Sequence, residues 1–282
     1  MREVVDLPTA TADDAVRRLL YEGWCQLDDA VSADAVEQLR TVVINIVDAR
    51  GATADGAPGR RLVDGLLSFD QSWAGLLAEP RLSGAMTTLH NADWRLGLHA
   101  AVVVAGGGRG SWYADWPFQA GHEQLQVGVP YGDLSMSLSA VVCLDDAAGL
   151  WVVPGSHRNS SNPGRGDAPS ADEDVSSARL IPARSGSMVV MDGRLWRADA
   201  ALSGRDGHPH ARLELNCIPW WVSAAPLLPG LSDYELAAAG ARSSSVPGRR
   251  VLPVSAEIYD ALSDEVKPRV RHLMAGQQVV PE

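Results

Sequence analysis

Residues 94–104 read WRLGLHAAVVV and mark the point at which the hydrophobic period of the chain changes from helical to extended. Short β-rich runs separated by Gly/Pro turns continue from there to residue 222. We predict eight of these strands, at 95–104, 111–118, 124–129, 134–144, 149–153, 179–182, 187–191 and 212–222. Because no long helix lies between them, the pattern predicts a closed or double-sheet β architecture.

Before this stretch the pattern is helical. Apolar residues recur at helical spacing over residues 12–50, in two runs, and Ser32 is the predicted N-cap of the second. We predict a short strand at residues 23–27, between the two helical runs. A third helix is predicted over about 73–90, with Pro80 starting or kinking its second half.

After the β-rich region the tail returns to a helical pattern, over about 231–241 and 255–275, with a Pro/Gly/Arg break at 246–253. One biased stretch, Asn159 to Ser177, is rich in Ser, Asn, Gly, Pro and acidic residues. This composition predicts a mobile loop or a lid over a site.

Composition excludes several classes of protein. Of the 282 residues, 46% are hydrophobic and 21% are charged, which is typical of a globular protein and not of a disordered one. No apolar run approaches the roughly 20 residues that span a bilayer. Lys and Arg number 24 against 35 Asp and Glu, and the net charge of −11 disfavours nucleic acid and anionic lipid as partners.

The cysteines and the N-terminal segment predict a compartment. Cys25, Cys143 and Cys217 are far apart and odd in number, which argues against a disulfide framework and for a reducing environment. The first residues have neither a basic start nor an apolar stretch, so we expect no secretory signal. The predicted localisation is therefore cytoplasmic.

Four motifs stand in one order across the β-rich region. They are SWYADWPF (111–118), LDD (144–146) with GLWVVPGSH (149–157), GSMVVMDGRLWR (186–197) and RLELN (212–216). Together they resemble the phytanoyl-CoA dioxygenase (PhyH) family of iron(II)/2-oxoglutarate oxygenases, over roughly residues 14–222. The Pro-Gly-Ser-His element and the Asp-Gly-Arg-Leu-Trp element carry most of the resemblance.

The resemblance implies a fold and a domain organisation. We expect a mainly β protein with flanking α-helices, built on a double-stranded β-helix (jelly-roll or cupin-like) core. A single domain is expected over 1–282, with a mostly helical part at 1–93, the jelly-roll core at 94–222 and C-terminal helices at 223–282.

In this family iron is held by two His and one carboxylate, and an Arg binds 2-oxoglutarate. Carried over residue by residue, the His-x-Asp pair falls on Tyr113 and Asp115, the distal His on Arg197, and the oxoacid-binding Arg on Arg212. A phenol is a poor ligand for ferrous iron, and a guanidinium stays protonated and cannot ligate. The resemblance thus predicts a lost triad with no metal and no cofactor; iron(II) and 2-oxoglutarate remain the alternative.

Without iron, we expect Arg197 to pair with Asp115 in place of the metal. Tyr113 would then be an acid–base group or hydrogen-bond donor, Asp115 its base or orienting group, and Arg197 an electrostatic stabiliser. Two alternatives remain open: Tyr113 packs in a collapsed site, and the Arg197–Asp115 pair is purely structural.

Six further residues are predicted to contact a substrate, namely Arg212, His157, Trp112, Trp116, Trp196 and His99. Each has a structural alternative: His157 caps its own turn, the tryptophans pack in the core, and Arg212 binds 2-oxoglutarate, another carboxylate or an internal Glu such as Glu214. His99, His122 and His157 are also the candidates for an unusual metal site with Asp115.

Three functions compete at this point. The first is a metal-independent tailoring enzyme that isomerises, cyclises or dehydrates a small polyketide- or terpenoid-like molecule, as in bacterial secondary metabolism. The second is an iron(II)/2-oxoglutarate oxygenase with unusual ligands. The third is a non-catalytic partner subunit of a functional oxygenase. The expected partner is a small molecule, with a homodimer or a complex with a related oxygenase as alternatives.

Overall fold

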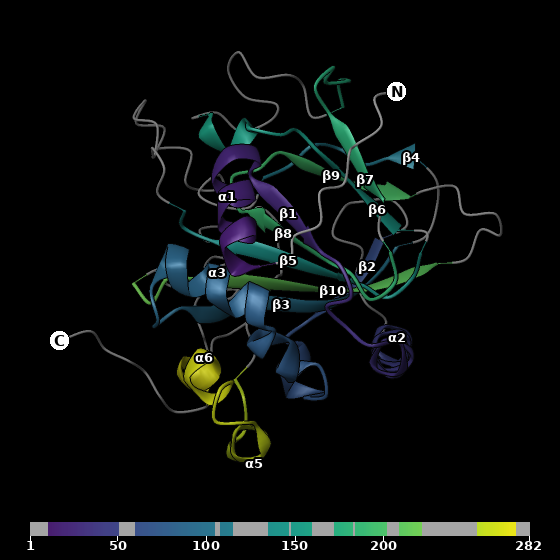
Figure 1. The fold of residues 1–282 in the computed structure, drawn as a ribbon. Coiled ribbons are helices and arrows are strands. Elements are labelled where there is room, and N and C mark those ends of the chain that lie inside the picture. The colour runs from purple at the N-terminus through teal and green to yellow at the C-terminus, as the bar shows by residue number, and fades with distance from the viewer. Residues whose placement is uncertain are drawn as a thin grey trace, which may run out of the picture.

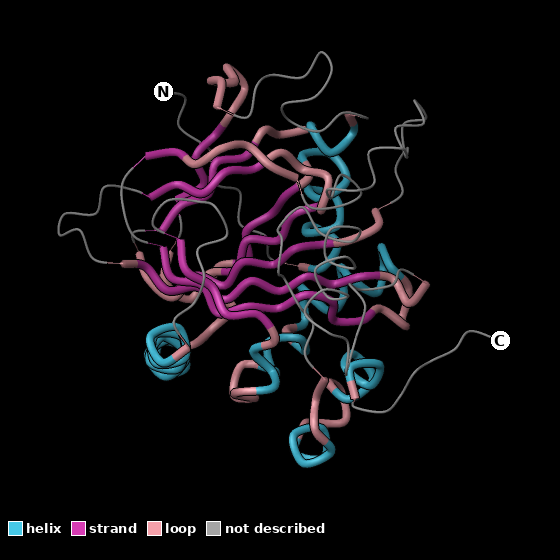
Figure 2. The backbone as a smooth tube through the Cα atoms, turned by 180° about the vertical axis from the view of Figure 1, so that it is seen from behind, coloured by secondary structure: helices cyan, strands magenta, loops and turns pink. Residues whose placement is uncertain are grey.

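The computed structural model describes residues 11–50, 60–104, 108–114, 135–146, 148–159, 172–182, 184–201, 209–221 and 253–274. Two antiparallel sheets form its centre, and helices lie on the outer side of the larger sheet (Figure 1; Figure 2). The fold is therefore mainly β with flanking helices, as expected. Within these ranges no helix has the length and apolar character that crossing a membrane requires.

Two helices and a strand open the described chain, as the sequence predicts. Helix α1 (Ala12–Glu22) begins at a capping box between Thr11 and Asp14. Helix α2 (Ala33–Ala49) begins at Ser32, whose hydroxyl accepts a hydrogen bond from the Ala35 N–H. Strand β1 (Trp24–Leu27) lies between the two helices.

The predicted third helix is split in two. A 3-10 helix, η2 (Ala74–Ala78), is followed by helix α3 (Pro80–His90), with Pro80 in the first turn. Proline fits there because its missing N–H would have no partner in the first turn of a helix. A shorter 3-10 helix, η1 (Leu66–Ser68), precedes them.

The larger sheet has six strands in the order β1-β8-β5-β10-β3-β2, and all neighbouring pairs are antiparallel. Its other strands are β2 (Arg60–Asp64), β3 (Arg95–Val104), β5 (Leu138–Cys143), β8 (Met188–Asp192) and β10 (His210–Ile218). The expected helical part at 1–93 therefore also supplies both edge strands of this sheet, β1 and β2.

The smaller sheet has four strands in the order β4-β9-β6-β7, again antiparallel. They are β4 (Gly108–Arg109), β6 (Ala148–Val152), β7 (Arg179–Pro182) and β9 (Arg197–Ala201). Strand β9 was not predicted, because three of its five residues are alanine, which has a low β propensity. It forms through pairing with β6 and β4.

Six of the eight predicted strands are confirmed, as β3, β5, β6, β7, β8 and β10. The predicted strand at 111–118 is described only to residue 114, where Tyr113 makes one isolated bridge. The predicted strand at 124–129 lies outside the described residues. Strands β2 and β4 were also missed.

The two faces of the larger sheet pack against different layers. One face packs on the helices in the main apolar core, which includes Leu213 and Leu215 of β10. The other face meets the smaller sheet, and a second apolar cluster there joins Val141 and Val189 to Leu150 and Val152. Because strand side chains alternate, Arg212 and Glu214 of β10 face the space between the sheets, which we call the barrel interior.

The C-terminal segment is less regular than predicted. Instead of one helix over 255–275, the chain forms α5 (Ala256–Ala261), α6 (Lys267–Val270) and the 3-10 helix η5 (Arg271–Leu273). Pro268 lies in the first turn of α6, where it prevents continuation of a helix from before it. The helix predicted at 231–241 lies outside the described residues.

Candidate active site

Tyr113 and Arg197 lie directly opposite each other in an isolated antiparallel bridge. The backbone N–H of each residue donates to the carbonyl oxygen of the other at 2.9 Å. The guanidinium carbon of Arg197 lies 5.0 Å from the centre of the Tyr113 ring, within the range of a cation–π contact. The two positions that the resemblance aligns with iron-binding histidines are therefore neighbours in space.

The direction of these side chains follows from strand β9. Arg197 and Asp199 pair across β9–β6 with Val152 and Leu150, both of which belong to the apolar cluster between the sheets. Directly opposite residues of an antiparallel pair point to the same face. Arg197 and Asp199 therefore face the barrel interior.

Four charged side chains form a buried cluster of ion pairs in the barrel interior, which we call the ionic cluster: Arg60, Asp199, Arg212 and Glu214. Arg60 donates to both carboxylate oxygens of Glu214 at 2.8 Å. Arg212 donates to Glu214 and to Asp199, each at 2.7 Å. Arg60 also forms an ion pair with Asp199 at 3.3 Å. Each arginine thus contacts both carboxylates.

The cluster shifts the pKa of Arg212 and of the neighbouring Tyr113. Burial alone would lower the pKa of Arg212, but the carboxylates of Asp199 and Glu214 outweigh burial and raise it. Burial raises the pKa of Tyr113, and Asp199 raises it further, while Arg197 opposes the rise. The Tyr113 phenol is therefore neutral near neutral pH and is available as a hydrogen-bond donor.

The residues at these positions do not fit the two groups that the resemblance implies. Ferrous iron would have to be held by a phenol and a guanidinium, and the fixed positive charge of Arg197 repels a divalent cation. The carboxylate of 2-oxoglutarate would have to bind Arg212, which is already paired with Glu214 and Asp199. Asp115, the third aligned position, lies outside the described residues, as does its expected pair with Arg197.

The two described tryptophans of the predicted substrate set do not face the barrel interior. Trp112 and Trp196 belong to an apolar cluster with Val153 and Ala198 and are almost fully buried. The Trp112 indole N–H donates to the Glu173 carbonyl oxygen at 2.8 Å. Strand alternation turns both away from Arg197, so the structure does not bring them together with it, and their contact with a substrate stays a prediction. Trp116 lies outside the described residues.

His99 is likewise not brought together with Tyr113 and Arg197, and its predicted contact with a substrate stays a prediction. It lies opposite Leu215 in the β10–β3 register, on the face that packs against the helices. The ring is fully buried, and its centre lies 5.5 Å from that of Trp73. His99 therefore packs in the helix-side core and does not line the barrel interior.

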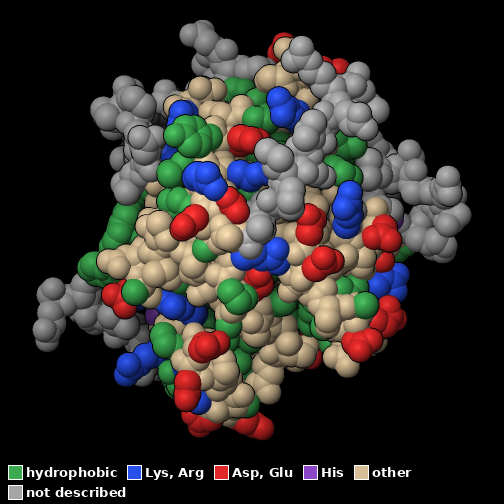
Figure 3. Space-filling view, in the orientation of Figure 1, with side chains coloured by type: hydrophobic (Ala, Val, Ile, Leu, Met, Phe, Trp, Pro, Cys, Tyr) green, Lys and Arg blue, Asp and Glu red, His purple; other side chains and the backbone are tan. Residues whose placement is uncertain are grey.

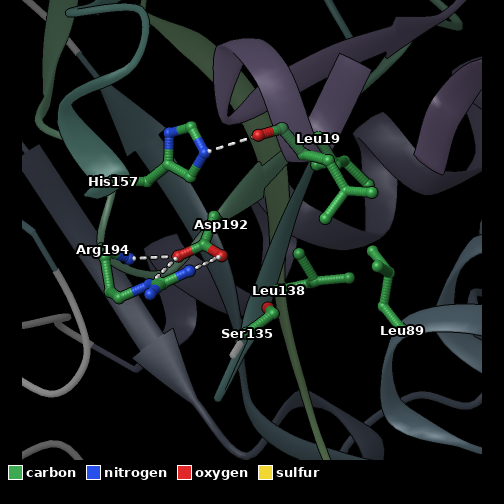
Figure 4. Close-up of a pocket in the computed structure, with 8 residues that line it drawn as sticks. Leu19, Leu89, Ser135, Leu138, His157, Asp192 and Arg194 are labelled. Carbon is green, nitrogen blue, oxygen red and sulfur yellow. Dashed lines mark hydrogen bonds and ion pairs between the residues drawn. The ribbon is translucent and has the colours of Figure 1, made fainter. Parts of the chain in front are cut away.

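His157 belongs to a different polar group, beneath α1. It lies in the 3-10 helix η4 (Ser156–Arg158), and its Nε2–H donates to the carbonyl oxygen of Leu20 at 3.2 Å. Figure 4 shows it beside a small cavity that is also lined by the ion pair of Asp192 and Arg194. Burial lowers the pKa of His157. None of the residues that line this cavity belongs to the ionic cluster, so the structure does not bring His157 together with the cluster, and its contact with a substrate stays a prediction.

Sequence reasoning missed two members of the cluster, Arg60 and Asp199. A signal for Asp199 exists, since it stands two residues after Arg197 and therefore shares its face if residues 197–201 form a strand. Arg60 has no comparable signal, because it follows a stretch with a loop composition and is not part of any of the four motifs. Of the options left open for Arg212, the structure shows an internal pair with Glu214, to which Asp199 is added.

Residues 69–203 match the family described as phytanoyl-CoA dioxygenase (PhyH). This segment belongs to the PhyH family. The PhyH segment contains Tyr113, Asp115 and Arg197 and ends before Arg212. No curated protein matches the chain.

Solved structures share the fold over most of the chain. The epimerase SnoN in complex with Fe3+, alpha ketoglutarate and nogalamycin RO has a TM-score of 0.57 and 15% identity, covering 78% of this chain and 91% of that one. HygX from Streptomyces hygroscopicus with nickel and 2-oxoglutarate bound has a TM-score of 0.58 and 16% identity, and the match covers 78% of this chain and 92% of that one. The alpha ketoglutarate dependent carbocyclase SnoK from nogalamycin biosynthesis has a TM-score of 0.54 and 18% identity, and the match covers 76% of this chain and 87% of that one. At these identities the likeness establishes the jelly-roll fold alone.

Proposed function

We propose that this PhyH-type protein is a small-molecule tailoring enzyme that catalyses a non-redox, metal-independent step such as isomerisation or cyclisation. The observation that carries the proposal is the Tyr113–Arg197 pair, which combines a proton donor and a fixed cation at the two positions aligned with iron-binding histidines. Such a pair polarises a carbonyl group and transfers protons, and it does not need a metal for either task.

In the proposed mechanism the neutral Tyr113 phenol donates a hydrogen bond to a carbonyl oxygen of the substrate. The Arg197 guanidinium stabilises the negative charge that develops on that oxygen when a neighbouring C–H is deprotonated. Asp115 is the proposed base or orienting group. The Arg197 guanidinium, whose carbon lies 5.0 Å from the centre of the Tyr113 ring, is the fixed positive charge that favours an enolate there.

The fold suggests the class of substrate. Two of the similar structures are described as a non-heme alpha ketoglutarate dependent epimerase and a non-heme alpha ketoglutarate dependent carbocyclase, both from nogalamycin biosynthesis. We propose a small polyketide- or terpenoid-like molecule with an enolisable carbonyl for this chain.

The decisive experiment removes oxygen and metal. Purified protein is incubated anaerobically with chelator and a panel of enolisable polyketide-type ketones in heavy water, and deuterium incorporation and isomer formation are followed by mass spectrometry. We expect incorporation at the carbon next to the carbonyl. Tyr113→Phe should reduce the rate by about 10²–10⁴-fold, the usual contribution of a general acid or base.

Tyr21→Phe is the matched control, because Tyr21 is an exposed tyrosine of α1 that is remote from the barrel interior and should keep the full rate. Turnover that appears only with oxygen, iron and 2-oxoglutarate would contradict the proposal.

That result would establish the second candidate, an iron(II)/2-oxoglutarate oxygenase with unusual ligands. One observation favours it: SnoN and HygX are described with metal and 2-oxoglutarate bound. Its signature is succinate released in proportion to product, measured together with the iron content of reconstituted protein.

A further inference from the structure

We infer that Glu214 and Asp199 are a built-in substitute for the carboxylate of 2-oxoglutarate, so that the barrel interior of this protein does not bind this cosubstrate. The inference concerns the ionic cluster alone and does not depend on the reaction proposed above. It starts from Arg212, the residue that the family resemblance assigns to 2-oxoglutarate.

Arg212 already has carboxylate partners of the kind that an oxoacid would supply. Its Nε and one terminal nitrogen donate to the same Glu214 oxygen at 3.1 and 2.7 Å, and that terminal nitrogen also donates to Asp199 at 2.7 Å. Only 2% of Arg212 is exposed. A guanidinium that is buried and paired in this way has satisfied its preference for carboxylate.

Arg60 closes the cluster from the other side. It comes from β2, at the edge of the larger sheet, and both Glu214 oxygens accept from it at 2.8 Å. Glu214 is thus held between two guanidinium groups, and Asp199 contacts both of them as well. An incoming dicarboxylate would have to displace an internal carboxylate and leave that charge buried without its partners, which is unfavourable.

The cluster also reaches the candidate catalytic pair. Asp199 stands two residues after Arg197 on the same face of β9. The charges of Asp199, Glu214 and Arg60 all act on the Tyr113 phenol. Asp199 therefore links the arginine expected to bind the oxoacid to the strand that carries Arg197.

The first test is direct. Calorimetric titration of the full chain with 2-oxoglutarate at millimolar concentration should give no saturable heat, and the same ligand should leave the melting temperature unchanged. A saturable heat with wild-type protein overturns the inference, whatever any variant does.

The second test opens the proposed anion site. Glu214→Ala removes one internal carboxylate and leaves Arg60 and Arg212 with excess positive charge. We expect 2-oxoglutarate or acetate to raise the melting temperature of this variant, with binding at least about tenfold stronger than to wild type, since charge-assisted pairs with arginine are restored. Sodium chloride at equal ionic strength should not reproduce the effect.

Glu79→Ala is the matched control. Glu79 is a partly buried carboxylate at the start of α3, and it pairs with Arg81 alone among the described arginines. This variant should lose stability without becoming a 2-oxoglutarate binder. If Glu214→Ala folds and neither anion binds or stabilises it, the inference is wrong.

Should Glu214→Ala fail to fold, Asp199→Ala provides the same measurement from the other carboxylate, and the wild-type titration still decides between the two outcomes. The proposed function is distinguished by a separate readout. Loss of turnover without oxygen and iron would reject the metal-independent reaction, whereas 2-oxoglutarate binding alone rejects only the substitution by Glu214 and Asp199.

Discussion

Arg60 and Arg212 show how single side chains determine the character of this barrel. Both are almost completely buried, where an uncompensated charge would be unfavourable, and both are satisfied by Asp199 and Glu214. A buried ion pair is not a strong source of net stability, but loss of one partner is expensive because the other charge stays behind. The cluster is therefore best understood as a fixed electrostatic environment for Tyr113.

The first prediction concerns that balance of charge. Asp199→Asn should lower the free energy of unfolding by about 3–5 kcal/mol, because two buried guanidinium groups lose a charged partner. The control is Asp48→Asn, whose carboxylate pairs with Arg61 at the surface, where both side chains are over two-fifths exposed; it should cost less than about 1 kcal/mol. Urea denaturation of both variants measures the difference, and equal losses would contradict the prediction.

His90 gives the second residue-scale prediction. It is 3% exposed at the end of α3, its Nε2 contacts the Ser135 hydroxyl at 3.1 Å, and burial lowers its pKa to about 4. The folded state therefore keeps His90 neutral while the unfolded state takes up a proton as the pH falls below about 6.5. Stability should fall between roughly pH 6.5 and 4, with His90 contributing on the order of 3 kcal/mol.

The measurement is the free energy of unfolding as a function of pH for wild type and His90→Gln. The variant should show a shallower decline over this range. Identical pH profiles would show that His90 is protonated to the same extent in both states.

At the scale of elements, α1, β1, β8 and the turn before η4 meet around one glycine. Gly23 ends α1 with a left-handed φ of 84°, and its carbonyl oxygen accepts from the Asp192 N–H at 2.8 Å. Next to it, the Gly155 N–H donates to the Glu22 carbonyl oxygen at 2.9 Å. This junction fixes the N-terminal helix to the larger sheet and places His157 beneath α1.

The third prediction compares two glycines with the same backbone conformation. A Cβ on Gly23 would lie 2.5 Å from His157 Nδ1 and 2.7 Å from Leu195 Cδ1, whereas a Cβ on Gly155, with φ of 81°, would meet open space. Gly155→Ala should cost about 1 kcal/mol for the left-handed backbone alone. Gly23→Ala should cost at least about 2 kcal/mol more because the junction must shift; equal losses in thermal denaturation would refute this.

The fourth prediction concerns the segment after residue 171. Arg109 of β4 stacks on Trp112 and donates to the carbonyl oxygens of Asp172 and Glu173 at 2.9 and 3.1 Å. Arg109→Gln should increase hydrogen exchange over residues 172–178 by on the order of tenfold, since a loss of about 1.4 kcal/mol in local stability has that effect. Arg158→Gln, which removes a hydrogen bond to Leu20 instead, should leave this segment unchanged in mass-spectrometric exchange.

At the scale of the whole molecule, charge is spread over the surface and the reactive groups are enclosed. Acidic and basic side chains are interspersed on the face shown in Figure 3, despite the net charge of −11. The three cysteines lie in β1, β5 and β10 of the larger sheet and are at most 1% exposed. A reagent can therefore reach these thiols only when the larger sheet opens.

The fifth prediction uses these thiols. Burial raises the pKa of Cys25 and Cys217 to about 12 and that of Cys143 to about 11. In the folded state a reagent therefore cannot reach the thiols, and the thiols are not ionised to the reactive thiolate. A thiol reagent such as Ellman's reagent should modify all three together, at a rate set by opening of the sheet. One cysteine that reacts promptly at neutral pH would show that its strand opens locally.

The sequence by itself determined the order of helices and strands wherever local signals are strong. Capping residues such as Thr11 and Ser32 and the extended run at 94–104 predict their elements because each signal acts within a few residues along the chain. The resemblance to the PhyH family added the jelly-roll fold and the alignment of Tyr113 and Arg197.

Only the tertiary structure decided which side chains meet. Strand β9 is alanine-rich and forms through its neighbours, and its register turns Asp199 inward and Ala198 outward. Arg60 reaches Glu214 across 154 positions of sequence, a contact that no local pattern encodes. Whether Arg212 binds a cosubstrate or an internal carboxylate depends on such long-range contacts, because the energy of a buried charge is set by what surrounds it in space.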